Sequence, residues 1–147
     1  KKNLGHSIIG TYHSEIKSSK FNQIFLEDII KVTSKYGFKL LIKTKKRNDT
    51  LALGGMSKNL INYYNKIQLN KNILLSDTGI AVEKILIKTK FSITLPYSSP
   101  AVIGKFLNKK SIFYDPLSKI FEDENSSGVK LIKGVDNLEK EIISICK

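Results

Sequence analysis

Two adjacent serines followed by a proline, Ser98, Ser99 and Pro100, are the residues of this chain best suited to bind a phosphate. Apolar residues at helical spacing come after them, so a serine can cap the helix and the proline fits its first turn. The start of a helix presents unpaired backbone N–H groups and the positive end of the helix dipole, to which two hydroxyl groups would add. The alternative is that Ser99 only caps the helix. The pattern supports both interpretations about equally.

A basic run at residues 43–47 is the second candidate for binding phosphate. Lys45 and Arg47 could neutralise a diphosphate or a phosphate ester as a sugar and a nucleotide separate. Arg47 is the only arginine among the 25 basic residues of the chain, which favours it and Lys45 over the other lysines. The alternative is a solvated surface, because the whole chain is rich in lysine.

Three further side chains follow predicted strands or stand beside the serines. His13 could contact a phosphate or act as a base, or it could be an ordinary loop histidine. Asp115 could accept a hydrogen bond from a ribose hydroxyl, but it precedes Pro116 and could simply stabilise a turn, which we favour. Tyr97 is a candidate contact for the ribose or the base. The pattern does not identify a catalytic residue.

The sequence lacks the common motifs of cofactor and metal chemistry. It contains no G-x-G-x-x-G, Walker lysine motif, H-E-x-x-H or nucleophile elbow, so we expect neither a cofactor nor a metal ion. Cys146 is the only cysteine, which excludes a disulfide framework and fits a reducing compartment. No apolar run approaches the roughly 20 residues that span a bilayer. We expect a location in the cytoplasm or at the inner membrane surface.

The net charge of +12 raises the alternative of a basic module that binds nucleic acid or an anionic membrane surface. Scattered lysines are usually a solvated surface, however, and a nucleic-acid site would need a localised basic face with stacking aromatic residues. We therefore do not expect nucleic acid to be a partner.

The elements that must position these residues alternate along the chain. Short apolar runs predict strands at residues 6–12, 39–43, 72–75, 91–95, 111–114 and 129–132. Apolar residues at three- and four-residue spacing predict helices from Phe21 to a glycine cap at Gly37, at residues 59–67 and 80–89, after Ser98, and after Asp136. Asp136 and Glu139 have the D-x-x-E spacing of a capping box.

This alternation predicts an α/β fold with one Rossmann-like, doubly wound and mainly parallel sheet of about six strands, covered by helices on both faces. The 147 residues are the size of one domain. Ligands of such sheets bind at the carboxyl ends of the strands, where the strand order reverses. Residues 13–14, 44–47, 96–99 and 115–116 all follow predicted strands and belong to that edge.

The segments at residues 92–105 and 110–116 resemble bacterial polysaccharide biosynthesis proteins named for a Pro-Phe-Thr-Ser motif. Pro96 and Ser99 match the motif, whereas Tyr97 and Ser98 stand where the family has Phe and Thr. The resemblance extends from about Ile8 to the end of the chain. It implies a GT-B-like glycosyltransferase, in which two Rossmann-like domains face each other and the C-terminal one holds the nucleotide-sugar.

The serine pair is also similar to the serine motif with which bacterial sialyltransferases of that architecture hold the donor phosphate. Their His-Pro motif is absent, because the corresponding strand end is Lys43, Thr44 and Lys45. This difference weakens the case for a CMP-sugar donor.

The resemblance therefore implies that residues 1–147 are the donor-binding half of a longer protein that builds O-antigen or capsule. A nucleotide-sugar would be the ligand, an N-terminal acceptor-binding domain the missing partner, and a lipid-linked sugar at the inner membrane the acceptor. The isolated domain is expected to be inactive, with any general base on the other domain.

Overall fold

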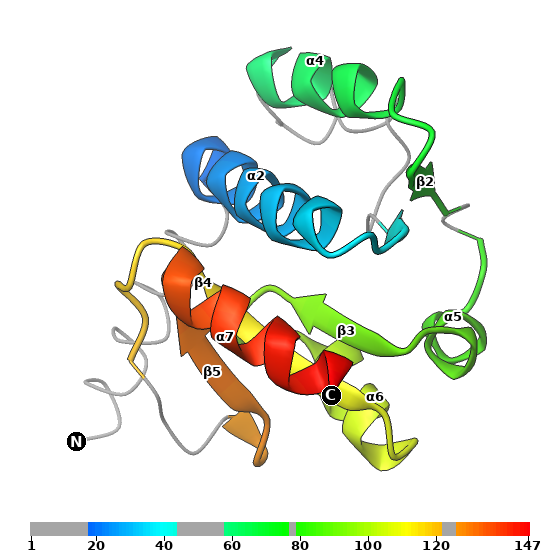
Figure 1. Ribbon diagram of the computed structural model, residues 1–147, viewed down its shortest axis with the longest axis vertical. Helices are drawn as coiled ribbons and strands as arrows, with labels where there is room; N and C mark the ends of the chain where they lie inside the picture. Colours follow the sequence, from blue (N-terminus) through cyan, green and yellow to red (C-terminus); the bar gives the residue numbers. More distant parts are fainter. Residues whose placement is uncertain (1–17, 44–57, 77–78, 122–125) are drawn as a thin grey trace, which may run out of the picture.

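The computed structural model describes residues 18–43, 58–76, 79–121 and 126–147. These residues form helices and strands that alternate along most of the chain, as predicted (Figure 1). The helices are α2 (Ser19–Lys35), α4 (Lys58–Ile67), α5 (Val82–Lys88), α6 (Ser99–Phe106) and α7 (Val135–Cys146). The strands are β1 (Leu40–Ile42), β2 (Ile73–Leu75), β3 (Phe91–Thr94), β4 (Lys110–Asp115) and β5 (Lys130–Lys133).

Helix α2 begins at Ser19, two residues before the predicted start at Phe21, and ends before Gly37 as predicted. Ser18 caps the first turn, because its hydroxyl oxygen accepts a hydrogen bond of 3.1 Å from the backbone N–H of Phe21. Gly37 follows the helix with φ of 72°, a conformation that glycine adopts without steric cost. The chain then turns directly into β1.

The sheet differs from the prediction of about six strands in one sheet. The described strands form two parallel sheets, one of two strands in the order β1-β2 and one of three strands in the order β3-β4-β5. Local patterns predicted every one of these strands, but the pairing of distant strands is not encoded in local periodicity. The predicted strand at residues 6–12 lies outside the described residues.

Strand β4 shows that the three-stranded sheet is covered on both faces. Tyr114 points to α2, where its ring lies 5.8 Å from that of Phe25 and its hydroxyl donates a hydrogen bond of 2.6 Å to Asp28. Ser111, three residues earlier, points to the opposite face and lies against Gly104 of α6. Side chains of a strand alternate between faces, so α2 and α6 belong to different layers.

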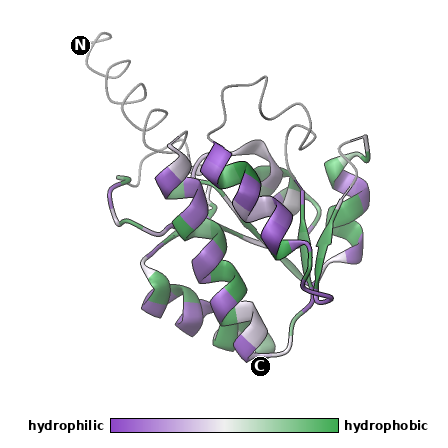
Figure 2. Cartoon of the chain, turned by 90° about the horizontal axis from the view of Figure 1, so that it is seen from above, coloured by the Kyte–Doolittle hydropathy of each residue, from purple (hydrophilic) through white to green (hydrophobic). Residues whose placement is uncertain are grey.

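The other helices complete these two layers. Helix α2 contacts both α4 and α7 and lies between them (Figure 1), while α5 contacts α6. The helices carry apolar stripes and hydrophilic stripes (Figure 2), as expected for elements packed on one side of a core. The fully buried side chains include Phe21 of α2, Phe113 of β4 and Leu138 of α7, which belong to one continuous core.

The predicted capping box at the last helix is wrong. Helix α7 begins at Val135, so Asp136 lies inside the first turn, and Gly134 occupies the cap position with φ of 77°. Glu139 contacts α2 instead, where it accepts hydrogen bonds from Lys35 at 2.5 Å and from the Tyr36 hydroxyl at 2.8 Å. These bonds, that of Lys35 first, lower the pKa of Glu139. A tertiary contact thus uses the carboxylate that the local pattern assigns to a cap.

Candidate functional site

The carboxyl edge of the three-stranded sheet is formed by three neighbouring strand ends. Thr94 of β3 is level with Phe113, and Asp115 of β4 is level with Lys133 of β5. Because all three strands are parallel, the segments that follow them meet at one edge. The structure thereby brings Tyr97, Ser98 and Ser99 to the same edge as Asp115, as the sequence predicted.

Helix α6 starts at this edge without a capping side chain. Ser98 holds the cap position with extended backbone, and its hydroxyl donates a hydrogen bond of 2.7 Å to the carbonyl of Leu95. It therefore turns away from the helix amides that a capping serine would accept from. The prediction of Ser99 as the cap is wrong by one residue, since Ser99 is already the first helical residue.

Ser99 is the exposed residue of this helix start. Its hydroxyl makes no hydrogen bond with any residue in the described part of the chain. Pro100 has no N–H, and Ala101 is fully buried, so the donors facing solvent in the first turn belong to Ser99. This residue offers a hydroxyl and a backbone amide at the positive end of the helix dipole.

Tyr97 occupies a strained position immediately before the serines. Its φ is 60°, which is uncommon for a residue with a side chain. The ring packs 5.5 Å from the ring of Phe113, and the hydroxyl donates a hydrogen bond to the backbone carbonyl of Phe121. Packing against β4 and bonding to the segment after it hold this loop in its unfavourable conformation.

Asp115 organises the loop that follows β4. Its side chain is fully buried, and its two carboxylate oxygens accept backbone hydrogen bonds from Leu117 at 3.0 Å and from Ile120 at 2.7 Å. The favoured interpretation of this residue as a turn former is confirmed. Its bonds shape the segment that includes Ser118, an exposed residue at the carboxyl edge that the sequence did not single out.

Gly134 closes the same edge from β5. Its N–H donates a hydrogen bond of 3.0 Å to the carbonyl of Asp115, and its positive φ turns the chain into α7. A Cβ placed on Gly134 would lie 3.7 Å from the hydroxyl of Ser118, so the two loops approach each other closely. A glycine two residues beyond the predicted strand at residues 129–132 was the available signal for this turn.

The other predicted contacts to phosphate, namely His13, Lys45 and Arg47, lie outside the described residues. Their placement near the serines remains a prediction.

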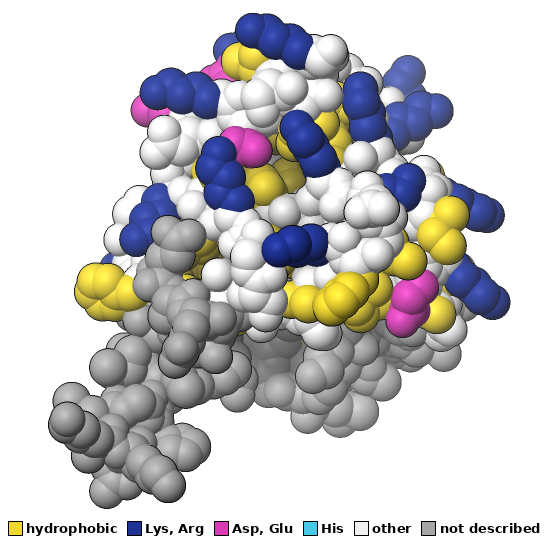
Figure 3. All heavy atoms as spheres, turned by 90° about the horizontal axis from the view of Figure 1, so that it is seen from below, with side chains coloured by type: hydrophobic (Ala, Val, Ile, Leu, Met, Phe, Trp, Pro, Cys, Tyr) yellow, Lys and Arg dark blue, Asp and Glu magenta, His cyan; other side chains and the backbone are white. Residues whose placement is uncertain are grey.

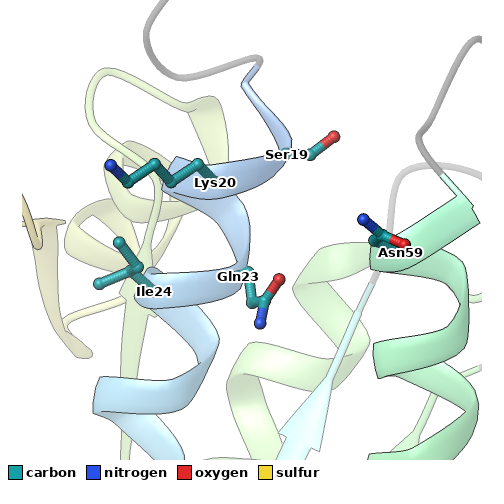
Figure 4. A pocket seen from close by; sticks show the side chains of 5 residues that line it. All are labelled: Ser19, Lys20, Gln23, Ile24 and Asn59. Atoms are coloured by element: carbon teal, nitrogen blue, oxygen red, sulfur yellow. The ribbon is translucent and has the colours of Figure 1, made fainter.

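A hollow of about 380 Å³ lies elsewhere, between the starts of α2 and α4 (Figure 4). The amide side chains of Gln23 and Asn59 point into the space between the two helices, and Ser19, Lys20 and Ile24 complete the lining. Gln23 already donates a hydrogen bond of 2.9 Å to Glu27. The predicted site residues that the structure describes, Tyr97, Ser98, Ser99 and Asp115, do not line this hollow.

Lysines are spread singly over the face shown in Figure 3, separated by apolar and uncharged side chains. Two lysines of the described residues form ion pairs, Lys35 with Glu139 and Lys130 with Glu141. Among the described residues, no cluster of three potential metal ligands occurs. Nor is any described helix both long and apolar enough to cross a membrane.

Comparison with known proteins identifies a family. A sequence model of the family described as polysaccharide biosynthesis PFTS motif proteins matches residues 9–142. The matched range includes the Tyr97, Ser98 and Ser99 segment and the strands on either side of it. No curated protein and no solved structure matches the chain.

Proposed function

Because the chain belongs to the polysaccharide biosynthesis PFTS motif protein family, we propose that it is the nucleotide-sugar-binding domain of a glycosyltransferase that builds bacterial surface polysaccharide. The family name supplies the pathway, and the position of the serines in the fold supports the choice of ligand. The donor would be held at the carboxyl edge of the sheet, by residues that follow β3.

The arrangement of helices supports this location. Helices α2 and α4 lie in one layer, whereas α5 and α6 lie in the other. The connecting helices therefore change from one layer to the other between β1 and β3. Doubly wound proteins bind ligands at the point where this change occurs, which is called the switch point. The segment at residues 95–98 is the first strand-to-helix connection after that change, and it leads into Ser99.

Ser99 and the start of α6 would hold a phosphate of the donor. An exposed hydroxyl and amide at the positive end of a helix dipole suit an anion, and Ser98 leaves this helix start without a side-chain cap. This uncapped start, placed beside the switch point, is the observation that carries the proposal.

Basic residues would assist the departure of the nucleotide. Lys45 and Arg47 would offset the charge of the leaving diphosphate in an inverting transfer that uses no metal ion, and His13 would add a contact. A second, acceptor-binding domain would supply any general base and close the site in a GT-B arrangement. The lipid-linked acceptor would approach from the inner membrane surface.

A thermal-shift screen tests the proposal directly. The chain is heated with UDP, GDP, CMP, CDP or dTDP, and a nucleotide at about 100 times its Kd should stabilise it by about 2.7 kcal/mol. Ser99→Ala should weaken the binding of that nucleotide by roughly 10- to 100-fold, since hydrogen bonds to charged groups contribute about 1.5–3 kcal/mol.

Ser144→Ala is the matched control, because Ser144 is also an exposed helical serine but lies near the end of α7. It should leave both the melting temperature shift and the Kd unchanged. Equal affinity of Ser99→Ala and the native chain would contradict the proposed phosphate site. Stabilisation by none of the five nucleotides would contradict donor binding by this domain alone.

A further inference from the structure

The ends of α5 and α6 bring exposed apolar side chains together. The two helices lie side by side (Figure 1), and just beyond their ends Lys109 donates a hydrogen bond of 3.2 Å to the backbone carbonyl of Thr89. Phe106, the last residue of α6, is 86% exposed, and both Leu107 after it and Ile87 near the end of α5 are also exposed. These three side chains therefore lie at the same end of the α5 and α6 layer.

The basic residues around this apolar group have no acidic partners. Residues 84–114 contain lysine at positions 84, 88, 90, 105, 109 and 110 and neither aspartate nor glutamate. Within the described chain, Lys84, Lys88 and Lys110 are exposed and form no ion pair. The side chains of Lys105 and Lys109 donate to backbone carbonyls, which do not neutralise their charge. We call the three apolar and the three exposed basic residues the basic apolar surface, namely Lys84, Ile87, Lys88, Phe106, Leu107 and Lys110.

The opposite layer of helices has nearly balanced charges. Helices α2, α4 and α7 together contain six lysines and five acidic residues. Helices α5 and α6 contain three lysines and one acidic residue, Glu83, although they are shorter. The two layers thus differ in charge, and the more positive layer is the one that exposes Phe106.

An anionic lipid membrane suits both features of this surface. Exposed aromatic and aliphatic side chains bury themselves at the boundary between headgroups and acyl chains, and neighbouring lysines attract anionic headgroups. A nucleic acid would contact the lysines but leave Ile87 and Leu107 in water, because bases stack on aromatic rings. A second copy of the chain, paired symmetrically, would bring the same positive charges together, which opposes association.

We propose that the basic apolar surface docks the chain on membranes that contain anionic phospholipids. Phe106 inserts below the headgroups, and Lys84, Lys88 and Lys110 lie among them. This docking needs no nucleotide and goes beyond the proposed function.

Helix α6 connects the docking surface to the proposed donor site. Ser99 is its first residue and Phe106 its last, so the helix separates the two by about 10 Å at a rise of 1.5 Å per residue. Docking would therefore hold a donor bound at Ser99 close to the lipid surface, where a lipid-linked acceptor is found. This consequence, unlike the docking itself, rests on the proposed function.

Cosedimentation with lipid vesicles tests the docking in the absence of nucleotide. The chain is mixed at physiological salt with vesicles of phosphatidylcholine alone or of equal parts phosphatidylcholine and phosphatidylglycerol. It should bind the mixed vesicles and bind the neutral ones at least roughly 10-fold more weakly. Binding to neither kind of vesicle, or equal binding to both, would overturn the proposal.

A triple variant tests the position of the charges. Changing Lys84, Lys88 and Lys110 to glutamine should weaken binding to the mixed vesicles by roughly 100-fold, since each lysine near an anionic surface contributes a factor of about 5.

The matched control removes the same charge from exposed lysines of α2 and α7, by changing Lys20, Lys31 and Lys140 to glutamine. It should weaken vesicle binding by less than about 3-fold, because these positions lie in the opposite layer and are screened by salt. Equal losses for the two triple variants would mean that net charge alone attracts the chain, and the docking surface would fall.

The apolar contribution is tested by Phe106→Ser, which should weaken vesicle binding by roughly 10-fold. Leu69→Ser is its control, because Leu69 is 87% exposed but follows α4 in the opposite layer. Neither change should alter the Tm, since both side chains are exposed. Unchanged vesicle binding by Phe106→Ser would overturn insertion. A dimer seen by analytical ultracentrifugation without lipid, and lost in Phe106→Ser, would assign the surface to a second copy instead.

The vesicle and nucleotide measurements fail independently. Selective vesicle binding without stabilisation by any nucleotide would keep the docking surface and remove the donor site. Stabilisation by a nucleotide without vesicle binding would do the reverse. Stronger effects of the lysine variant on duplex DNA than on vesicles would assign these lysines to nucleic acid and overturn the docking.

Discussion

Tyr114 is the residue whose side chain most directly links α2 to the sheet. The residue is fully buried, and its hydroxyl donates a hydrogen bond of 2.6 Å to the half-buried Asp28. Burial, followed by the hydrogen bond to Asp28, raises the pKa of Tyr114 well above its ordinary value. The phenol therefore remains a neutral donor at the pH values at which proteins are usually studied.

We predict that Tyr114→Phe lowers the free energy of unfolding by about 1–2 kcal/mol. The hydrogen bond to a charged acceptor is lost, but Asp28 is exposed enough to recover part of its hydration. Urea denaturation measures the change. Tyr36→Phe removes the same hydroxyl from a surface contact to Glu139 and should cost less than about 0.5 kcal/mol. Equal losses for the two variants would show that burial of the Tyr114 bond does not matter.

At the scale of elements, the close approach of α6 to the sheet depends on Gly104. A Cβ on this residue would lie 2.1 Å from the Ser111 hydroxyl oxygen and 3.2 Å from the Ser111 Cβ. The Ser111 hydroxyl is in turn hydrogen-bonded at 2.7 Å to that of Ser92 on the neighbouring strand. An alanine would have to displace this pair of serines or push the helix away.

We predict that Gly104→Ala destabilises the chain by about 1–3 kcal/mol, although alanine favours a helix over glycine by about 1 kcal/mol. Ser111→Ala removes the nearest atom and should relieve part of the clash. A double-mutant cycle measured by denaturation should therefore give a coupling of roughly 0.5–2 kcal/mol in favour of the double variant. Additive effects of the two changes would mean that helix and strand adjust without strain.

The positions of the helices were easier to predict from the sequence than the residues at which they start or the way in which the strands pair. The spacing of Phe21, Phe25, Ile29 and Val32 predicted the buried face of α2, and all four residues are buried. The end of this helix was also predictable, because glycine adopts the positive φ at residue 37 without steric cost. Strand positions followed from apolar runs, but strand order requires knowledge of which face each helix covers.

The candidate site was predictable in its location more than in its details. The Pro-Tyr-Ser-Ser-Pro segment after a strand correctly indicated a helix start at the carboxyl edge. The sequence could not show that Ser98 bonds back to Leu95, since a serine at a helix start normally accepts from the helix instead. Nor could it show Ser118, whose position depends on the backbone bonds accepted by Asp115.

At the scale of the whole molecule, the amount and the distribution of charge bear on the choice between the proposed function and a nucleic-acid-binding module. The net charge of +12 attracts any polyanion, yet the lysines are dispersed on the face in view (Figure 3). We expect binding to a duplex DNA to be independent of sequence, no tighter than about 10⁻⁶ M at physiological salt, and to fall steeply between about 50 and 200 mM salt.

Fluorescence anisotropy with labelled duplexes of different sequence, measured beside nucleotide binding in the same buffers, tests this expectation. Nucleotide affinity should change little over that salt range, because a site of a few donors releases few counterions. Replacing the exposed Lys66 and Lys88 together by glutamate should weaken duplex binding further and leave nucleotide binding unchanged, since neither residue is at the carboxyl edge. Tight, sequence-selective duplex binding at physiological salt would instead assign the charge to a dedicated nucleic-acid surface. The absence of nucleotide stabilisation in the same samples would then favour that function over donor binding.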